Sequence, residues 1–197
     1  MTAAAPIKGP YSPTEKVTDM ATPAHENSDT RILVAAGSKH GGTTEIANRI
    51  GDTLRDRGFD TTVAESGQVR SVQGFDVVVL GSAVYAGHWM ATAKDMADVV
   101  AEAEPMPAVW LFSSGPVGDP PKPDVDPADV VDITRSTGAR GHELFAGKLD
   151  RSKLNFGERA ITAALRAPEG DFRDWAAIDR WAGRIAESRG SESPRAV

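Results

Sequence analysis

The chain has 197 residues, 40% of them hydrophobic and 25% charged, with a formal net charge of −6 and no cysteine. This length suits one domain of ordinary size, and the lack of cysteine excludes disulfides, thiolate metal sites, iron–sulfur clusters and thiol nucleophiles. The net negative charge argues against a general nucleic-acid-binding protein, and no apolar run approaches the ~18–20 residues of a membrane span, so we expect a cytoplasmic α/β protein.

Both ends of the chain lack the residues that build a core. Residues 1–29 contain four prolines and no leucine, phenylalanine or tryptophan, so they bury too little apolar surface to offset the entropy lost on ordering. They also lack the basic and apolar regions of a signal peptide. We therefore predict a disordered tail over residues 1–29, one folded domain over 30–189, and a short disordered tail over 190–197.

The first predicted strand leads into a helix. Residues 32–36 are continuously apolar, as in a parallel strand buried on both faces. A glycine-rich turn follows at residues 37–42, and then a helix of about four turns that Thr43 or Thr44 caps. The apolar residues of this helix recur every fourth position, which indicates one buried face.

Strands and helices continue to alternate along the chain. Further strands are predicted at residues 59–63, 75–81, 107–112 and 142–146, with a helix from the end of an 82–89 loop to about residue 103. The last helix takes Asp171 as its N-cap and presents to the core Trp175, Ile178, Ala182 and Ile185. This order implies a doubly wound five-stranded parallel sheet with helices on both faces.

Two segments of the sequence have no counterpart in a minimal fold of this kind. Residues 116–127 hold five prolines and three aspartates, which predicts an irregular surface excursion. Residues 153–166 suit a short amphipathic helix inserted between the fifth strand and the last helix.

Three loops leave the carboxyl ends of the strands, where open parallel sheets bind ligands. They cover residues 38–43, 82–89 and 113–118, and we expect them to line one crevice. The first loop offers the hydroxyls of Ser38 and Thr43 and the backbone N–H groups of a helix N-terminus, a combination that binds anions. Its sequence fits neither the P-loop nor the dinucleotide fingerprint. The competing interpretation is a plain turn that uses glycine for tightness.

The first loop reads Ser-Lys-His-Gly-Gly-Thr, and three further stretches, at residues 79–88, 144–149 and 172–175, are also typical of one protein family. On these motifs, the chain from Arg31 to about Ala186 resembles the flavodoxin-domain proteins of the menaquinone-dependent protoporphyrinogen IX dehydrogenase family. The stretch Phe-Ala-Gly-Lys-Leu, followed by an inserted helix, is more specific for this family than the first loop, which resembles the phosphate-binding loop of flavodoxins. The resemblance implies a flavodoxin-like fold, with strand order 2-1-3-4-5, that binds FMN non-covalently.

The resemblance also implies which residues hold FMN. The phosphate would bind at Ser38, Lys39, His40, Gly41, Gly42 and Thr43. One side of the isoalloxazine ring would lie against Ala83, Val84, Tyr85, Ala86, Gly87 and His88, and the other against Ser113, Ser114, Gly115 and Pro116. Tyr85 can stack on the flavin and His88 can donate a hydrogen bond or a proton, so these two are the catalytic candidates. The structural alternatives are a packing residue at Tyr85, a polar helix start at His88 and a solvated side chain at Lys39.

The third loop has no aromatic residue, whereas electron-carrier flavodoxins usually enclose the ring between two. An open ring face favours contact with a small substrate. We therefore expect an FMN-dependent oxidoreductase with a quinone or a porphyrinogen as small-molecule donor or acceptor. The alternatives are an electron carrier that serves redox partner proteins and a flavin-free interaction module.

Residues 140–167 carry six basic and three acidic residues in this acidic chain. These residues form either a solvated basic face or a surface that attracts anionic groups. Such groups could be porphyrin propionates, an acidic partner or a membrane surface that the protein contacts peripherally. The four histidines lack metal-binding spacing, and the run Asp124-x-Asp126-x-x-Asp129 lacks the glycine and glutamate of a calcium loop. No metal site is therefore predicted.

Overall fold

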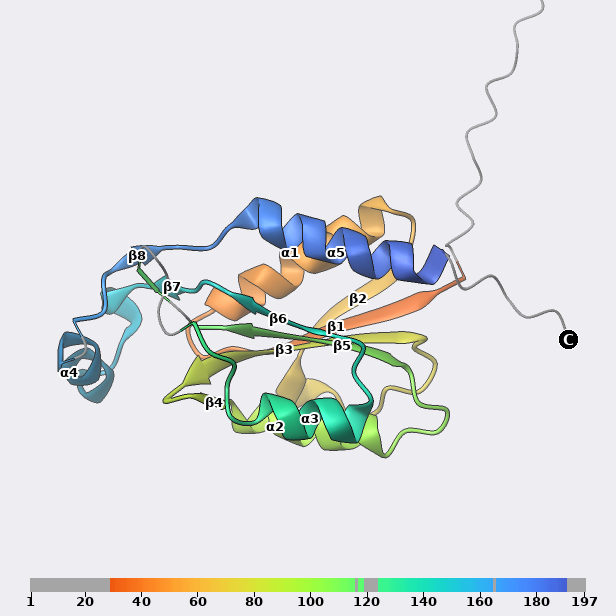
Figure 1. Ribbon diagram of the computed structural model, residues 1–197, viewed down its shortest axis with the longest axis horizontal. Helices are drawn as coiled ribbons and strands as arrows, with labels where there is room; N and C mark the ends of the chain where they lie inside the picture. Colours follow the sequence, from red (N-terminus) through yellow and green to blue (C-terminus); the bar gives the residue numbers. More distant parts are fainter. Residues whose placement is uncertain (1–28, 116, 119–123, 165, 191–197) are drawn as a thin grey trace, which may run out of the picture.

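A computed structural model describes residues 29–115, 117–118, 124–164 and 166–190. The two predicted tails lie outside the described residues, apart from Asp29 and Gly190, and so does part of the 116–127 excursion. Helices cover both faces of a central sheet (Figure 1). None of the helices in the described part of the chain is long and apolar enough to cross a membrane.

The central sheet, as far as the chain is described, has six strands in the order β2-β1-β3-β5-β6, with the short β4 paired to β3 off this path. The five main strands are β1 (Arg31–Gly37), β2 (Asp60–Glu65), β3 (Val77–Tyr85), β5 (Ala108–Ser114) and β6 (His142–Phe145). All four pairings along the path are parallel, which confirms the predicted order. Ser82 is the register partner of both Gly37 and Ser113, so three strands end at the same edge.

Two helices pack on each face of the sheet (Figure 1). The first pair is α1 (Gly42–Asp56) with α5 (Trp175–Gly190), and the second is α2 (Ala91–Ala101) with α3 (Val130–Thr137). The helices of the first pair share a buried cluster with β1 and β3, and those of the second share another with the opposite side of the same strands. Burial on both sides explains why these strands are continuously apolar.

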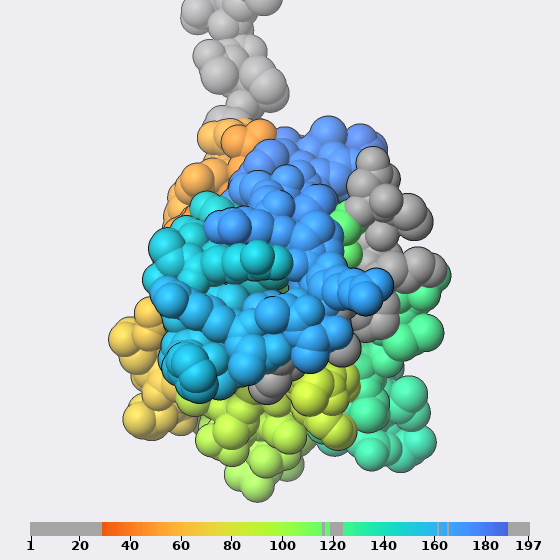
Figure 2. Space-filling view, turned by 90° about the vertical axis from the view of Figure 1, so that its left-hand side faces the viewer, coloured from red at the N-terminus to blue at the C-terminus, as the bar shows by residue number. Residues whose placement is uncertain are grey.

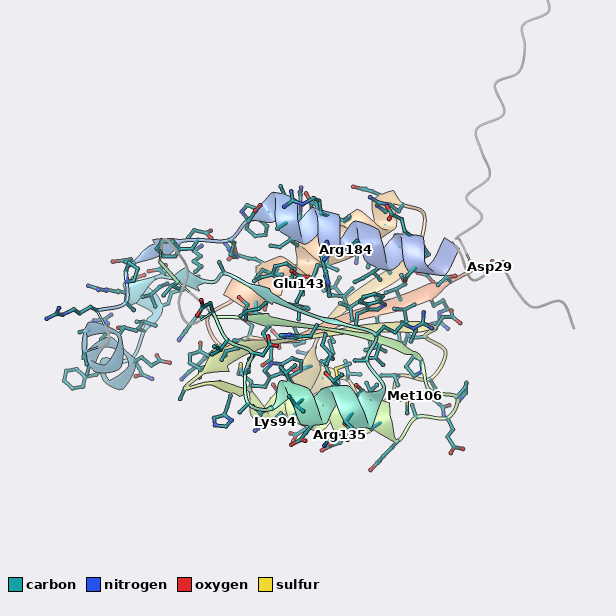
Figure 3. All side chains as sticks on the ribbon, in the orientation of Figure 1. Asp29, Lys94, Met106, Arg135, Glu143 and Arg184 are labelled. Carbon is teal, nitrogen blue, oxygen red and sulfur yellow. The ribbon has the colours of Figure 1, made fainter. Side chains whose placement is uncertain are left out.

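An insertion, residues 146–174, projects past the carboxyl ends of the strands on the left of Figure 1. It holds β7 (Lys148–Leu149), η2 (Arg151–Lys153), α4 (Phe156–Ala164) and β8 (Gly170–Asp171), and β7 pairs antiparallel with β8. The predicted inserted helix is therefore present, with narrower bounds. Figure 3 shows Asp29 at the opposite end of the sheet. Arg184 Nη2 of α5 donates a hydrogen bond to Glu143 Oε2 of β6 at 2.8 Å.

Several predicted elements differ from the structure. The segment 82–89 is not a loop: β3 continues to Tyr85, a turn follows at Ala86 and Gly87, and β4 (His88–Trp89) pairs back onto β3. A turn of only two residues allows the chain to reverse directly, because both turn residues adopt positive φ. The helix α3 and the short η1 (Ser66–Gln68) occupy stretches for which the sequence predicts no helix.

The helix caps also differ from the prediction. Gly41 is the N-cap of α1 and no side chain caps it within the described residues, so Thr43 and Thr44 lie in its first turn. The last helix begins at Trp175, where the Asp174 carboxylate accepts the Ala177 N–H at 2.9 Å. Asp171 therefore does not cap this helix, and Trp175 is 36% exposed instead of lying in the core.

Candidate functional site

The site forms where the carboxyl ends of β1, β3 and β5 meet the insertion. The phosphate loop, which we define as residues 38–43, follows β1, and the hairpin of β3 and β4 lies beside it. Figure 2 looks onto this end of the molecule and shows the insertion spread across it. The three strand-end segments therefore lie together as predicted, under a fourth segment that the minimal fold does not require.

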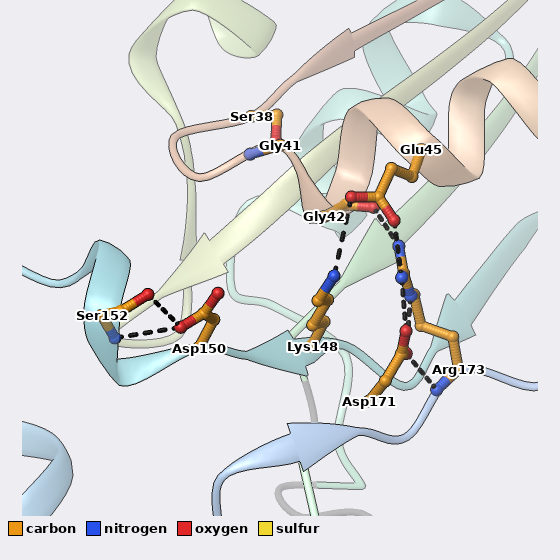
Figure 4. Close-up of polar contacts among 9 residues, drawn as sticks. All are labelled: Ser38, Gly41, Gly42, Glu45, Lys148, Asp150, Ser152, Asp171 and Arg173. Carbon is orange, nitrogen blue, oxygen red and sulfur yellow. Dashed lines mark hydrogen bonds and ion pairs between the residues drawn. The ribbon is translucent and has the colours of Figure 1, made fainter.

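The N-terminus of α1 presents unpaired donors beside open space. Ser38 Oγ accepts the Gly41 N–H at 3.1 Å and so shapes the phosphate loop (Figure 4). Gly41 has a φ of 85°, and a Cβ built on it would meet nothing within 4 Å. The first N–H groups of a helix have no partner within the helix. Thr43 is 3% exposed, and its hydroxyl has no hydrogen-bond partner among the described residues. This arrangement fits a bound anion.

Lys39 and His40 of the phosphate loop contact an acidic side chain of the insertion. Lys39 Nζ lies 2.7 Å, and His40 Nε2 3.1 Å, from Oε1 of Glu158 on α4. Because an ionised carboxylate only accepts hydrogen bonds, the His40 Nε2–H donates this one. Residues 118 positions apart in the sequence thus form one charged cluster at the candidate phosphate site.

Tyr85 lies next to the same cluster. Tyr85 is 40% exposed, Lys39 Nζ lies over its ring at 5.7 Å from the centroid, and the His40 ring approaches it edge-on with the centroids 6.4 Å apart. Burial, and then the charge of Glu158, raises the pKa of Tyr85 to about 12. The phenol is therefore neutral near pH 7 and can donate a hydrogen bond, but it cannot act as a base.

Arg173 joins the insertion to α1. Its side chain is 1% exposed, Nη2 donates to Glu45 Oε2 at 2.7 Å, and Nη1 donates to the Gly42 carbonyl at 3.0 Å (Figure 4). It also bonds to the carboxylate of Asp171. Lys148 Nζ lies 3.9 Å from Glu45 on the other side. These contacts hold β7 and β8 against the first turn of α1.

The structure divides the predicted 113–118 loop, because Ser113 and Ser114 are the last residues of β5. Ser113 is fully buried: Trp89 Nε1–H donates to its Oγ at 2.8 Å, and His142 Nε2 lies 2.8 Å from it. Ser113 therefore has no side-chain surface for a ring. Ser114 is 5% exposed and Gly115 is partly exposed, while Pro116 lies outside the described residues.

The remaining candidates lie on the hairpin. Ala83 is 8% exposed, and the rest of the predicted set, from Val84 to His88, lies nearer the surface. His88 Nδ1 is 3.2 Å from Asp129 Oδ2. The structure thus brings Tyr85 to the phosphate loop, while the described contact of His88 is with the start of α3.

The sequence analysis missed Glu158, Arg173 and His142 as members of this region. One local signal was available for Glu158, because Asn155-x-x-Glu158 has the spacing of a capping box before a helix. Their distant partners have no signal in a single sequence.

Comparisons with known proteins agree with this architecture. A family model described as flavodoxin domain matches residues 33–175. No curated protein matches the chain. A flavodoxin structure from the domain Archaea is 13% identical, with a TM-score of 0.55, over 81% of this chain and 98% of that one.

Two further solved structures are similar. Flavodoxin 2 from Bacillus cereus is 17% identical, with a TM-score of 0.53, over 83% of this chain and 100% of that one. The flavodiiron core of Flv1 from Synechocystis is 10% identical, with a TM-score of 0.60, over 86% of this chain and 38% of that one. At these identities, the likeness concerns the fold.

Proposed function

The chain belongs to the flavodoxin-domain family, and from that premise we propose that it binds FMN non-covalently and acts as an oxidoreductase. The observation that carries this proposal is the uncapped N-terminus of α1, with open space at Gly41 and an unpartnered hydroxyl on Thr43, a residue that is 3% exposed. A phosphate supplies the acceptor oxygens that such donors lack.

Each part of the phosphate loop has a role in this proposal. The first N–H groups of α1 and the Thr43 hydroxyl donate to the phosphate, and Gly41 lets the backbone approach it. Ser38 shapes the loop through its bond to the Gly41 N–H. Lys39 adds a positive charge that attracts a dianion.

The hairpin provides the flank for the ring. FMN, when bound, supplies the chemistry of hydride and electron transfer, and the protein orients it. Tyr85 keeps its proton throughout the physiological range, so it offers a neutral ring and a hydroxyl to a neighbour. His88 remains a candidate donor at the rim of the hairpin, where its ring is 59% exposed.

The insertion supports a small-molecule partner over a protein partner. It lies across the strand ends (Figure 2), where a redox protein would otherwise approach over a broad face. The resemblance noted for the sequence makes quinones and porphyrinogens the candidate substrates. The exposed basic residues Arg151 and Lys153 of the insertion would attract the propionates of a porphyrinogen.

The test begins with the absorption spectrum of the purified protein and identification of any released cofactor. We expect FMN, and we expect neutral quinone analogues to reoxidise the reduced protein rapidly. Fast reoxidation only by redox proteins would contradict the oxidoreductase assignment and favour an electron carrier. A protein that cannot be loaded with any flavin would overturn the proposal altogether.

The substrate has a separate test. Reversing the charges of Arg151 and Lys153 should raise KM for protoporphyrinogen IX, while reaction with neutral quinones stays nearly unchanged. Added salt should weaken only the porphyrinogen reaction, because it screens exposed charges. Turnover of quinones without turnover of the porphyrinogen would retain the enzyme class and reject this substrate.

A further inference from the structure

The two carboxylate oxygens of Glu158 bind different partners. Oε2 accepts the Asn155 N–H at 2.9 Å, while Asn155 Oδ1 accepts the Glu158 N–H at 2.9 Å, which completes a capping box at the start of α4. Oε1 takes the contacts with Lys39 and His40. The same side chain therefore begins α4 and joins it to the phosphate loop.

Glu158 places a lasting negative charge at this loop. Its side chain is 14% exposed, against 46% for Lys39. The hydrogen bond from Lys39, followed by that from the Asn155 N–H, lowers the pKa of Glu158 to about 2. The group stays ionised at every pH at which the protein would be assayed.

Few of the described side chains of α4 pack against the domain. Among the α4 residues whose side chains are described, only Glu158 and Thr162 are partly buried, and the others are exposed. Phe156, the first residue of the helix, is 90% exposed. Among the described side chains of α4, Glu158 therefore supplies the ion pair that joins the helix to the phosphate loop.

We propose that Glu158 competes with the flavin phosphate for Lys39 and His40, and so sets how strongly the site selects a phosphorylated flavin. This inference rests on the proposed function. Lys39 and His40 can bind either anion, the phosphate in addition to its donors on α1, and at short range the two anions repel each other. A phosphate in the loop displaces Glu158 from Lys39 and His40, and α4 loses its main contact with the domain.

The variant Glu158→Gln isolates the charge. The glutamine oxygen still accepts the Asn155 N–H, so the cap remains, but the repulsion and the ion pair are gone. Titration by quenching of flavin fluorescence should give a Kd for FMN about fivefold lower than in the unmodified protein, and an unchanged Kd for riboflavin. The matched control is Glu169→Gln, in the same insertion, because Glu169 accepts the Arg151 N–H and has no described contact with the phosphate loop; both affinities should stay unchanged.

Amide hydrogen exchange gives a readout that does not depend on affinity. FMN should speed up exchange in residues 156–164 of the unmodified protein, whereas riboflavin should not. The gain in FMN affinity caused by Glu158→Gln should also be smaller when Lys39→Gln is present in the same protein, because the shared donor is then absent.

The possible results separate the two proposals. Equal affinities of the unmodified protein for FMN and riboflavin contradict the proposed phosphate site itself. A clear preference for FMN that Glu158→Gln leaves unchanged or weakens overturns only the competition. Slower exchange in α4 on binding FMN overturns it as well.

Discussion

Ser113 Oγ and His142 Nε2 lie 2.8 Å apart beneath the indole of Trp89, and His142 Nδ1 lies 3.2 Å from Asp126 Oδ1. These distances match those of a Ser–His–Asp hydrolase site. Ser113 is fully buried, however, so no acyl substrate can reach its oxygen. The network instead ties the hairpin, β5 and β6 to Asp126.

This network predicts a pH dependence of stability. Burial lowers the pKa of His142 below its ordinary value of 6.5, although Asp126 and Glu143 act in the opposite direction. As the pH falls below about 6.5, the unfolded chain takes up a proton before the folded one, so the folded state loses stability. Denaturant unfolding at pH 7.5 and 5.5 should show a larger loss in the unmodified protein than in His142→Gln. Equal losses in the two proteins would contradict this role.

The turn of the hairpin predicts opposite effects at neighbouring positions. Ala86 has a φ of 50° and Gly87 a φ of 81°, a region that costs an L-residue roughly 1 kcal/mol. Ala86→Gly should therefore stabilise the flavin-free protein by about 0.5–1 kcal/mol, and Gly87→Ala should destabilise it by about 1 kcal/mol. Thermal unfolding of the two variants checks both signs; a destabilised Ala86→Gly would contradict a strained backbone at Ala86.

The buried contacts of Arg173 predict that replacing this one residue greatly lowers the free energy of unfolding. Arg173→Met keeps most of the volume but leaves the Gly42 carbonyl and two carboxylates without their donor, which should cost about 2–3 kcal/mol of unfolding free energy. The matched control is Arg49→Met, which breaks a bidentate pair with Asp179 whose arginine is 50% exposed, and it should cost much less than Arg173→Met because water screens the exposed pair. Comparable losses in both variants would contradict the special place of Arg173.

The fold was predictable because its signals are local. The apolar run of residues 32–36 and the fourfold spacing along α1 report burial directly, and the alternation of strands and helices fixes a parallel order. The hairpin was missed because Ala86 occupies a turn position that usually holds asparagine, aspartate or glycine. α3 was missed because its eight residues follow a proline-rich stretch and carry few apolar side chains.

The site was predictable only in part. The phosphate loop has a sequence motif, and the hairpin contains the end of the strongest strand, so the positions of Thr43 and Tyr85 at this edge of the sheet could be predicted. Ser113 is predicted to lie beside the ring because it is near the end of a strand at this edge, but its side chain is buried in contacts with Trp89 and His142. Glu158 and Arg173 act through partners more than a hundred residues away, and no pattern in one sequence pairs them.

The most direct test of the central claim compares FMN with riboflavin, which differs only by the phosphate. Charge-assisted hydrogen bonds at the N-terminus of α1 should make the Kd for FMN at least about tenfold lower than that for riboflavin. Thr43→Ala should weaken the binding of FMN and leave the binding of riboflavin unchanged. Gly41→Val should weaken FMN binding further, because the side chain blocks the approach of the phosphate to the backbone. Equal affinity for the two flavins, or equal weakening of both by Thr43→Ala, would contradict the assignment of residues 38–43 as the phosphate site.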